Sequence, residues 1–503
     1  MQRERIWQAA IVLALVALVA WSFYQRWQML AASPFPLGVD GYFYPIQLRA
    51  LLEDGSLQYP SSPLTFYFMA PFAAATDEIT GAKLGAALGG ALIALPAYAV
   101  GARFGRSRGA GLIAAALVAN SASSLYLSFE FVKQGLGLTV GMTALWLLLR
   151  ALDAPTRLRI GSALAALVAA YLTHKLAAAV VMAIAVPAAI EEARGRAKLR
   201  GRRLLYLLAV LGVLGLVVVV LGIAAPQRFL SPGDAALLTN ALSSDAYWSA
   251  PALATERVTL AFEHEAAVGA VLAIAAAVVI RLRPTKPRKH GERAAQWMVV
   301  AFAIAIALPW LAVSDPQGLG FRLRIAAFVP LALCAAMLVD PLLARIKQLA
   351  PSERELVAGG FALLLAIRPH AKPTEGVVLA HPAMVTAVMA SARQIPAGKT
   401  VIVPERHILF MVAWYTRATV SLRPWPVPAE RRVRMMPLAF IGMDSPLDQE
   451  IDRARNVHSI APPLGFHPRH RNGLVLVEER TWLWLLAHLP HRARMHWGRW
   501  QTI

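Results

Sequence analysis

Charged residues and cysteine are both scarce in this chain. Only 16% of its 503 residues are Asp, Glu, Lys or Arg, whereas 57% are hydrophobic and the mean hydropathy is +0.53. A soluble domain of this length would need more polar surface, so the composition predicts that lipid is the main solvent of the chain. The single cysteine, Cys334, excludes an intramolecular disulfide and a cysteine metal cluster, and its apolar neighbours in the sequence are typical of a core residue.

Acidic residues are fewer than basic ones, 29 against 50, which gives a formal net charge of +21. On a soluble domain this charge would suggest a nucleic-acid partner, but most basic residues of the first two-thirds lie in short links between apolar runs. Such links face the cytoplasm by the positive-inside rule, so the charge indicates topology, and no nucleic-acid partner is expected. The sequence also lacks an internal repeat, which disfavours an inverted-repeat transporter.

Apolar runs of about 20 residues cross a bilayer core, and the sequence predicts a polytopic α-helical membrane protein with about 11 of them. The run at 62–72 is short and is placed outside, whereas the long run at 160–190 is interrupted at 173–175 and predicts two helices. No small-residue cleavage site follows the first run, which is therefore expected to be retained. With the N-terminus inside and the C-terminus outside, the loops 23–79 and 225–264 are external. The predicted spans are 6–22, 80–101, 109–127, 133–149, 159–172, 176–190, 204–224, 265–280, 295–313, 325–343 and 355–367.

The composition of the sequence changes near residue 369, where Pro, His and Arg become frequent. We expect a transmembrane domain over 1–368 and a small periplasmic α/β domain over 369–503, which ends in an amphipathic segment. Its predicted strands are 400–404 and 474–477, and its predicted helices are 383–393 and 447–455. The chain is thus predicted to be a multi-pass protein of the bacterial inner membrane.

Asp40 is the first candidate for chemistry on the predicted external side. It follows the first span in a segment rich in Pro, Gly and Tyr, and a short surface helix that ends near Gly55 comes after it. A loop aspartate is commonly a turn or helix-cap residue, or it activates a nucleophile or binds a metal. Tyr42, Tyr44 and Arg49 accompany it and are candidates for the substrate loop.

Glu130 is the second candidate acid, in the short external turn before the fourth predicted span. A carboxylate between two phenylalanines at a membrane boundary is costly unless it is solvated, paired or functional. Lys133 lies three residues further on, so a simple ion pair is the alternative to a catalytic role.

Four cations on the same predicted side are candidates for binding a phosphate. His174 and Lys175 lie between two short spans, where they would otherwise extend toward the lipid headgroups. Arg322 and Arg324 lie at the external end of a span, against the positive-inside pattern, where they bind lipid phosphate nonspecifically or hold one lipid substrate. External carboxylates with external cations suit transfer from a lipid-phosphate donor.

The first 150 residues resemble the GT-C superfamily of integral-membrane glycosyltransferases. Val39–Tyr44 and Leu48–Gly55 are similar to the first-loop motif of oligosaccharyltransferase catalytic subunits, an Asp followed by aromatics and a helix that ends in Gly. Glu130, with Gly135–Leu138 after it, falls where those enzymes carry a second acidic motif. This turn has one acid where they usually have two, and the C-terminal region lacks a Trp-Trp-Asp motif, its nearest aromatic pair being Trp414–Tyr415. The resemblance therefore implies a related enzyme that uses a polyprenyl-phosphate-linked sugar.

The resemblance implies a reaction at the periplasmic membrane surface. Asp40 and Glu130 would be the catalytic or metal-binding acids, with Mg²⁺ or Mn²⁺ as the implied cation, and the sugar would pass to an envelope acceptor (glycan, lipid or protein) with inversion at its C1 atom. Membrane lipids would be further partners. A lipid-linked glycan flippase or other transporter, and a noncatalytic membrane scaffold, are the alternatives from other functional classes.

Overall fold

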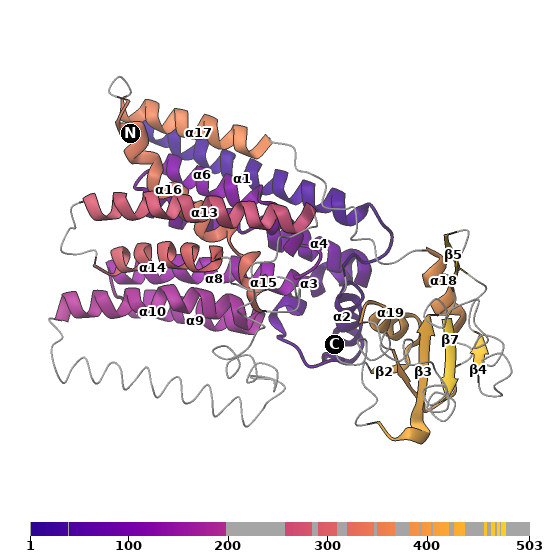
Figure 1. Cartoon of the computed structure of the whole chain (residues 1–503). Coiled ribbons are helices and arrows are strands. Elements are labelled where there is room, and N and C mark those ends of the chain that lie inside the picture. Colours follow the sequence, from indigo (N-terminus) through magenta and orange to yellow (C-terminus); the bar gives the residue numbers. More distant parts are fainter. Residues whose placement is uncertain are drawn as a thin grey trace. The chain divides into compact units, whose positions relative to one another are not determined.

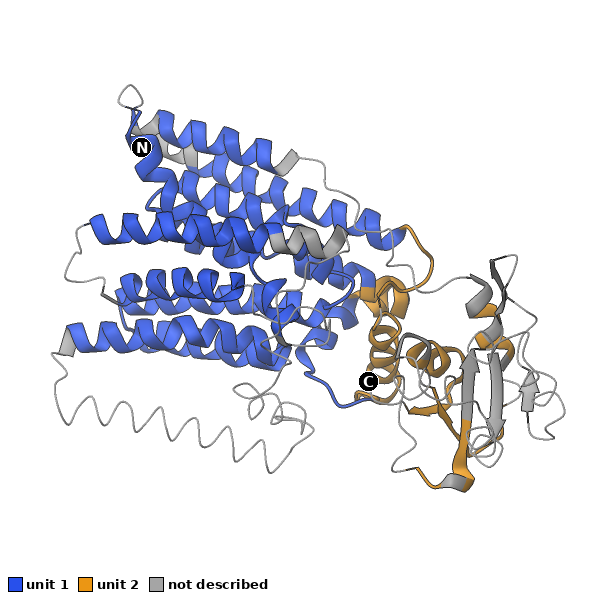
Figure 2. Ribbon diagram, viewed as in Figure 1, with its two compact units in different colours: residues 1–31, 59–71, 83–373 blue, residues 32–58, 72–82, 374–503 orange. Residues whose placement is uncertain are grey.

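The structure of the chain is a computed structural model (Figure 1). It forms two compact units (Figure 2). Unit 1 comprises residues 1–31, 59–71 and 83–373, and unit 2 comprises 32–58, 72–82 and 374–503. Unit 2 therefore joins part of the predicted first external loop to the C-terminal region. The structure describes residues 2–38, 40–197, 257–283, 290–308, 319–346, 350–367, 382–391, 395–403, 406–421, 427–437, 457–459, 464–467, 470–472 and 474–478.

Unit 1 is a bundle of apolar helices that lie side by side in Figure 1. Large apolar side chains such as Leu13 and Val271 are 68% and 66% exposed, as expected of helices whose solvent is lipid. The helices that lie wholly in this unit are α1 (Gln2–Ala31), α5 (Ala94–Gly105), α6 (Arg108–Ala119), α7 (Ala122–Leu127), α8 (Val132–Asp153), α9 (Arg157–Thr173), α10 (Lys175–Ala197), α13 (Arg257–Leu282), α14 (His290–Ala307), α15 (Leu319–Arg324), α16 (Phe328–Ala344) and α17 (Pro351–Ile367). Two more, α3 (Leu64–Ala75) and α4 (Glu78–Ala91), contribute to both units.

Six segments of the described residues are long and apolar enough to cross a membrane: 8–31, 78–105, 132–153, 175–195, 264–282 and 320–344. The chain is therefore a mostly helical, multi-pass membrane protein. Of the predicted spans, the one at 204–224 lies outside the described residues, and the others overlap described helices. The total of about 11 crossings and their orientation stay predictions.

The two ambiguous segments form the helices that their lengths indicate. Helix α9 ends at Thr173 and α10 begins at Lys175, with His174 in extended backbone between them, so the predicted interruption is confirmed. The short run at 62–72 falls in α3, a helix of 12 residues that is too short to span a bilayer core at 1.5 Å per residue.

Small residues allow the helices of unit 1 to approach one another closely. A Cβ atom at Gly101 of α5 would lie 2.5 Å from the Ala114 side chain of α6, so glycine is needed for this contact. Cys334 of α16 is fully buried in the same core, as predicted. At one end of the bundle Arg103 pairs with Asp153 at 2.7 Å and with Glu292 at 2.9 Å, which ties α5 to α8 and α14.

Unit 2 contains a five-stranded mixed sheet with the strand order β2-β1-β3-β7-β4. Strand β1 pairs in parallel with β2 and β3, and β7 pairs antiparallel with β3 and β4. The predicted α/β character is confirmed, and α18 and β7 match the predicted segments 383–393 and 474–477, whereas the predicted helix 447–455 lies outside the described residues. The remaining elements are α2 (Phe43–Asp54), α18 (Pro382–Ser391), β1 (Thr400–Ile402), α19 (Arg406–Thr416), β2 (Thr419–Ser421), η2 (Ala429–Arg431), β3 (Arg432–Pro437), β4 (Val457–Ser459), the hairpin β5 (Leu464–His467) and β6 (His470–Asn472), and β7 (Leu474–Glu478).

Candidate functional site

The turn that carries Glu130 lies in unit 1 between α7 and the N-terminus of α8. Glu130 is 7% exposed, and its backbone N–H donates to the carbonyl oxygen of Tyr126 at 3.1 Å. The Lys133 ammonium donates to the hydroxyl of Ser61 at 2.9 Å. The N–H groups of the first helical turn have no intrahelical acceptor and carry the positive end of the helix dipole, so the start of α8 favours a negative ligand.

Arg322 packs against this turn. Its guanidinium carbon lies 5.1 Å from the ring centroid of Phe131, the residue that follows Glu130, and its carbonyl oxygen accepts a hydrogen bond from Gln134 Nε2 at 2.7 Å. The Phe131 ring also contacts Phe321, with ring centroids 6.2 Å apart. A predicted acid and a predicted cation are thus brought to the N-terminal end of the same helix.

His174 lies against the second turn of α8. A Cβ atom at Gly137 would lie 2.7 Å from the His174 Cβ atom, so glycine makes room for the break between α9 and α10. His174 Nδ1 accepts the N–H of Ala177 at 3.4 Å in the first turn of α10, and Lys175 is the next residue. Arg324 is 4% exposed, and its Nη2 atom donates at 2.8 Å to the carbonyl oxygen of Leu308, just after α14. Its observed contact is therefore structural.

Arg26 holds the segment ahead of Glu130 and was not among the predicted site residues. This arginine of α1 is fully buried, where an ion is costly unless its donors are satisfied. Its guanidinium donates to Ser128 Oγ (2.9 Å), Ser124 Oγ (2.7 Å) and the carbonyl oxygens of Ser22 (3.1 Å) and Ala119 (3.3 Å). The same positive-inside argument that selected Arg322 could have found it, because it too lies at the predicted external end of a span.

Glu265 of α13 holds the other end of α7 and was also missed. Its carboxylate accepts the Ser121 hydroxyl at 3.0 Å, the Ala122 N–H at 2.9 Å and the Ser123 hydroxyl. A carboxylate at this position satisfies donors of the helix N-terminus and complements its dipole. The signal was an acid at the edge of a predicted span. Arg26 and Glu265 together fix α7 and so limit the positions that the Glu130 turn can take.

Asp40 lies in unit 2, in a tight turn before α2. The Gly41 N–H donates to the carbonyl oxygen of Gly38 at 3.1 Å, and the Phe43 N–H donates to the carbonyl oxygen of Asp40 at 3.0 Å. Gly38 has a φ of 82°, and a Cβ atom at Gly41 would lie 2.5 Å from the Leu37 carbonyl oxygen, so both positions need glycine. The backbone of Asp40 is therefore part of a turn, and its partly buried side chain comes two positions before Tyr42, the N-cap residue of α2.

Aromatic residues of the predicted substrate loop pack on α19. The hydroxyls of Tyr42 and Tyr415 are 3.1 Å apart, and the ring centroids of Phe43 and Phe410 are 5.1 Å apart. Tyr44 is 5% exposed and stacks edge-on against Phe43. Burial, with the hydrogen bond between the two hydroxyls, raises the pKa of Tyr42 well above its ordinary value. Tyr42 therefore stays neutral.

Arg49 fastens the same helix to α19. Its guanidinium carbon lies 4.4 Å from the ring centroid of Trp414, and its Nη1 atom donates to the Trp414 carbonyl oxygen at 3.2 Å. Glu53 and Arg417 add an exposed ion pair at 3.4 Å. The sequence alone singled out Trp414–Tyr415 only as an aromatic pair, and the structure gives both residues a role in holding the loop that begins at Asp40.

The predicted residues thus form one group in each unit. Glu130, Arg322 and His174 gather around the start of α8, while Asp40 lies with Tyr42, Tyr44 and Arg49 in unit 2. Among the described residues there is no group of three or more His, Cys, Asp or Glu side chains that could hold a metal ion. The predicted Mg²⁺ or Mn²⁺ at Asp40 and Glu130 therefore stays a prediction.

Comparison with known proteins shows that the chain shares its fold with a solved membrane protein. No family model and no curated protein sequence matches the chain. The structure is similar to ArnT from Cupriavidus metallidurans bound to undecaprenyl phosphate, with a TM-score of 0.50 and 13% identity over 92% of this chain and 97% of that chain. The apo state of that protein matches with a TM-score of 0.49 and 12% identity, over 93% of this chain and 98% of that chain. The Archaeoglobus fulgidus oligosaccharyltransferase in complex with Zn and sulfate matches with a TM-score of 0.46 and 14% identity, over 81% of this chain and 62% of that chain. The predicted resemblance to GT-C membrane glycosyltransferases is confirmed at the level of the fold.

Proposed function

We propose that the chain is a membrane glycosyltransferase that moves a sugar from a polyprenyl-phosphate-linked donor to an acceptor in the envelope, on the periplasmic face. The observation that carries the proposal is the fold shared over 92% of the chain with ArnT, a protein whose structure was solved with undecaprenyl phosphate bound. The cationic surroundings of the α8 N-terminus support it, because a lipid phosphate needs such a partner.

The reaction is a single displacement with inversion at the sugar C1 atom. The acceptor oxygen forms a bond to C1, the bond from C1 to the donor phosphate oxygen breaks, and its electron pair leaves with the polyprenyl phosphate. Asp40 takes the proton of the acceptor hydroxyl as general base. Glu130 accepts a hydrogen bond from a substrate hydroxyl and so orients it.

The leaving phosphate gains negative charge as the C1–O bond breaks. Arg322, beside the N-terminal turn of α8, stabilises this charge more in the transition state than in the bound donor, which is the condition for a faster reaction. His174 and Lys175, at the break against the second turn of α8, supply further donors to the same anion. Tyr42, Tyr44 and Arg49 position the loop that carries Asp40.

The decisive experiment compares Asp40→Asn with the wild type in proteoliposomes. The vesicles receive a panel of undecaprenyl-phosphate-linked sugars and an envelope extract as acceptor, and the release of undecaprenyl phosphate is measured. Asp40→Asn should abolish release with normal expression in the membrane, because an amide cannot take the proton. Asp54→Asn removes an exposed acid from the end of α2 and is the matched control, which should keep the wild-type rate. Wild-type release by Asp40→Asn would refute the assignment.

The position of the polar groups favours an enzyme over a transporter. A transporter carries its substrate groups near the middle of the membrane, in discontinuous helices. In the predicted topology, Glu130 and His174 instead lie in external turns at one membrane face, one between α7 and α8 and the other between α9 and α10. Movement of a labelled lipid-linked sugar across vesicles without release of polyprenyl phosphate would support the transporter.

A further inference from the structure

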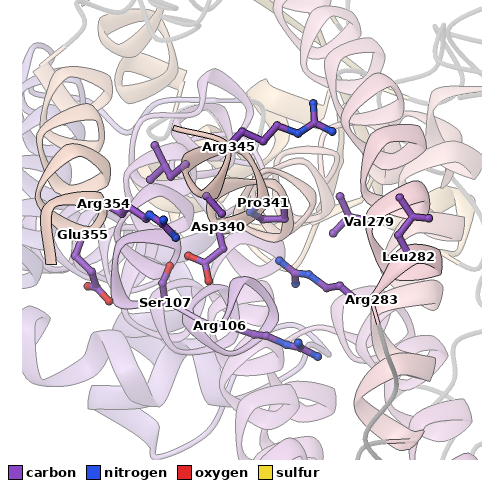
Figure 3. Close-up of a pocket in the computed structure, with 12 residues that line it drawn as sticks. Arg106, Ser107, Val279, Leu282, Arg283, Asp340, Pro341, Arg345, Arg354 and Glu355 are labelled. Carbon is purple, nitrogen blue, oxygen red and sulfur yellow. The ribbon is translucent and has the colours of Figure 1, made fainter. Parts of the chain in front are cut away.

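A cavity of about 550 Å³ opens in unit 1 where several helices end or begin (Figure 3). It lies at the other end of α6 and α16 from the groups described above: α6 begins here and leads toward the Glu130 turn, and α16 ends here after starting behind Arg322. The charged residues that line it are Arg106, Arg283, Asp340, Arg345, Arg354 and Glu355.

Four different elements contribute the arginines, so the convergence is a tertiary feature. Arg106 follows α5, Arg283 follows α13, Arg345 follows α16, and Arg354 lies in the first turn of α17. Figure 3 shows Arg283 and Arg354 pointing toward Asp340 from two sides. Four arginines against two acids leave two positive charges on the lining residues. A recess whose lining carries a net positive charge concentrates anions.

The two acids of the cavity offset its four arginines only in part. Glu355 Oε1 accepts the backbone N–H of Arg108 at 3.3 Å, at the start of α6. Arg283 is half-buried, and its pKa is lowered by that burial and by the charge of Arg106, while Asp340 acts in the opposite direction. An anion in the cavity would relieve the repulsion between Arg106 and Arg283.

The backbone of Arg106 has a left-handed conformation at the end of α5. Its φ is 67°, in the left-handed region that non-glycine residues rarely adopt, and it follows the last residue of α5. Glycine is the usual residue at such a helix end because it has no Cβ penalty. An arginine here carries strain of about 1 kcal/mol, which a glycine would relieve.

We propose that this cavity binds the phosphate of an anionic phospholipid headgroup. A guanidinium group can donate two parallel hydrogen bonds to two oxygens of a phosphate. Basic pockets between membrane helices on the cytoplasmic side bind anionic phospholipid headgroups in this way. The basic links at this end are the ones that the positive-inside rule places in the cytoplasm. Apolar Val279 and Leu282 also line the cavity, and Leu282 is 76% exposed, which suits acyl chains beside the bound headgroup.

The test follows the unfolding temperature of the full chain in neutral detergent by tryptophan fluorescence. The added probes are phosphatidylglycerol, phosphatidylcholine and inorganic phosphate, titrated separately. Phosphatidylglycerol should raise the unfolding temperature in a saturable way, and the two other probes should leave it within about 1 °C of the unliganded value. Inorganic phosphate that stabilises as well as the lipid would overturn the headgroup as the occupant.

Arg106→Gly separates binding from structure. Glycine relieves the left-handed strain, so the unliganded protein should melt at the same or a higher temperature, while the apparent affinity for phosphatidylglycerol should fall at least about tenfold. Arg345→Gln, which changes an exposed lining residue, should lower the apparent affinity for phosphatidylglycerol by a similar factor.

The matched control is Arg281→Gln, which removes an exposed arginine near the end of α13 that does not line the cavity. It should keep the wild-type affinity within about twofold, because its exposed side chain does not line the cavity and its charge is screened by solvent and salt. Wild-type affinity in both cavity variants, or an equal loss in the control, would refute the site. Sugar transfer by the wild type does not depend on these outcomes.

Discussion

The Nε atom of Arg26 donates to the hydroxyl of Ser128 at 2.9 Å, two residues before Glu130. The bond joins the first helix of the chain to the turn ahead of α8, across 102 residues of sequence. Both residues are buried, at 0% and 3% exposure, so water cannot replace a lost partner. Arg26 is a positioning residue for the Glu130 turn.

Gly90 of α4 makes room for this hydrogen bond. A Cβ atom at position 90 would lie 2.7 Å from both Arg26 Nε and Ser128 Oγ. Gly90→Ala should therefore displace the guanidinium, lower the unfolding temperature and reduce sugar transfer at least about tenfold, although alanine is the better helix former. Gly360→Ala on α17 is the control, because no atom lies within 4 Å of its added Cβ. It should melt at or above the wild-type temperature. A Gly90→Ala enzyme with normal transfer would show that the turn tolerates movement.

Arg322→Ala should weaken the use of the lipid donor more than that of the acceptor. The guanidinium is assigned to the donor phosphate, and a lost charge-assisted hydrogen bond costs about 1.5–3 kcal/mol, which is about 10-fold to 150-fold in kcat/KM for the donor. Initial rates measured against each substrate in turn separate the two effects. An unchanged donor KM and kcat would remove Arg322 from the site.

Arg49→Lys should loosen the loop that carries Asp40. Lysine keeps the charge but loses the planar stacking on Trp414 and the geometry of the bond to its carbonyl oxygen, at a cost of about 1–2 kcal/mol. Limited proteolysis of the region 32–58 should become faster. Arg417→Gln is the control, because its pair with Glu53 is 69% and 49% exposed at the two side chains and contributes little. Equal proteolysis of the wild type and Arg49→Lys would contradict the role of the stacking contact.

Alkaline pH should destabilise unit 2 through Tyr42 and Tyr415. Burial raises the pKa of both hydroxyls above their ordinary value of about 10, so both stay neutral in the folded state while the unfolded chain ionises. The contribution of these two hydroxyls to the free energy of unfolding is fully present below about pH 10, and it falls as the pH rises toward their pKa values in the folded state. Tyr415→Phe removes one titrating group and should flatten this fall, measured by urea unfolding between about pH 8 and about pH 11 with tyrosinate absorbance as a second probe. An identical pH dependence in the variant would exclude this pair as its source.

Much of the helical bundle could be predicted from the sequence because hydropathy and charge are local properties. The break at His174 followed from the length of one apolar run, and the buried Cys334 from its apolar neighbours. The surface helix after Asp40 was predicted with its end at Gly55, whose φ of 68° favours a residue without a side chain. The strands near 400 and 474 followed from short runs of β-branched and aliphatic residues.

The sequence by itself determined that this is a membrane protein, and it singled out Asp40, Glu130 and the misplaced cations, because periodicity and the positive-inside rule act on neighbouring residues. Only the tertiary structure decided what holds them. Arg26 reaches Ser128 across most of the first quarter of the chain, and Trp414 reaches Arg49 across 365 residues. Such contacts depend on how helices pack, and a composition rule carries no information about which buried donor meets which acceptor.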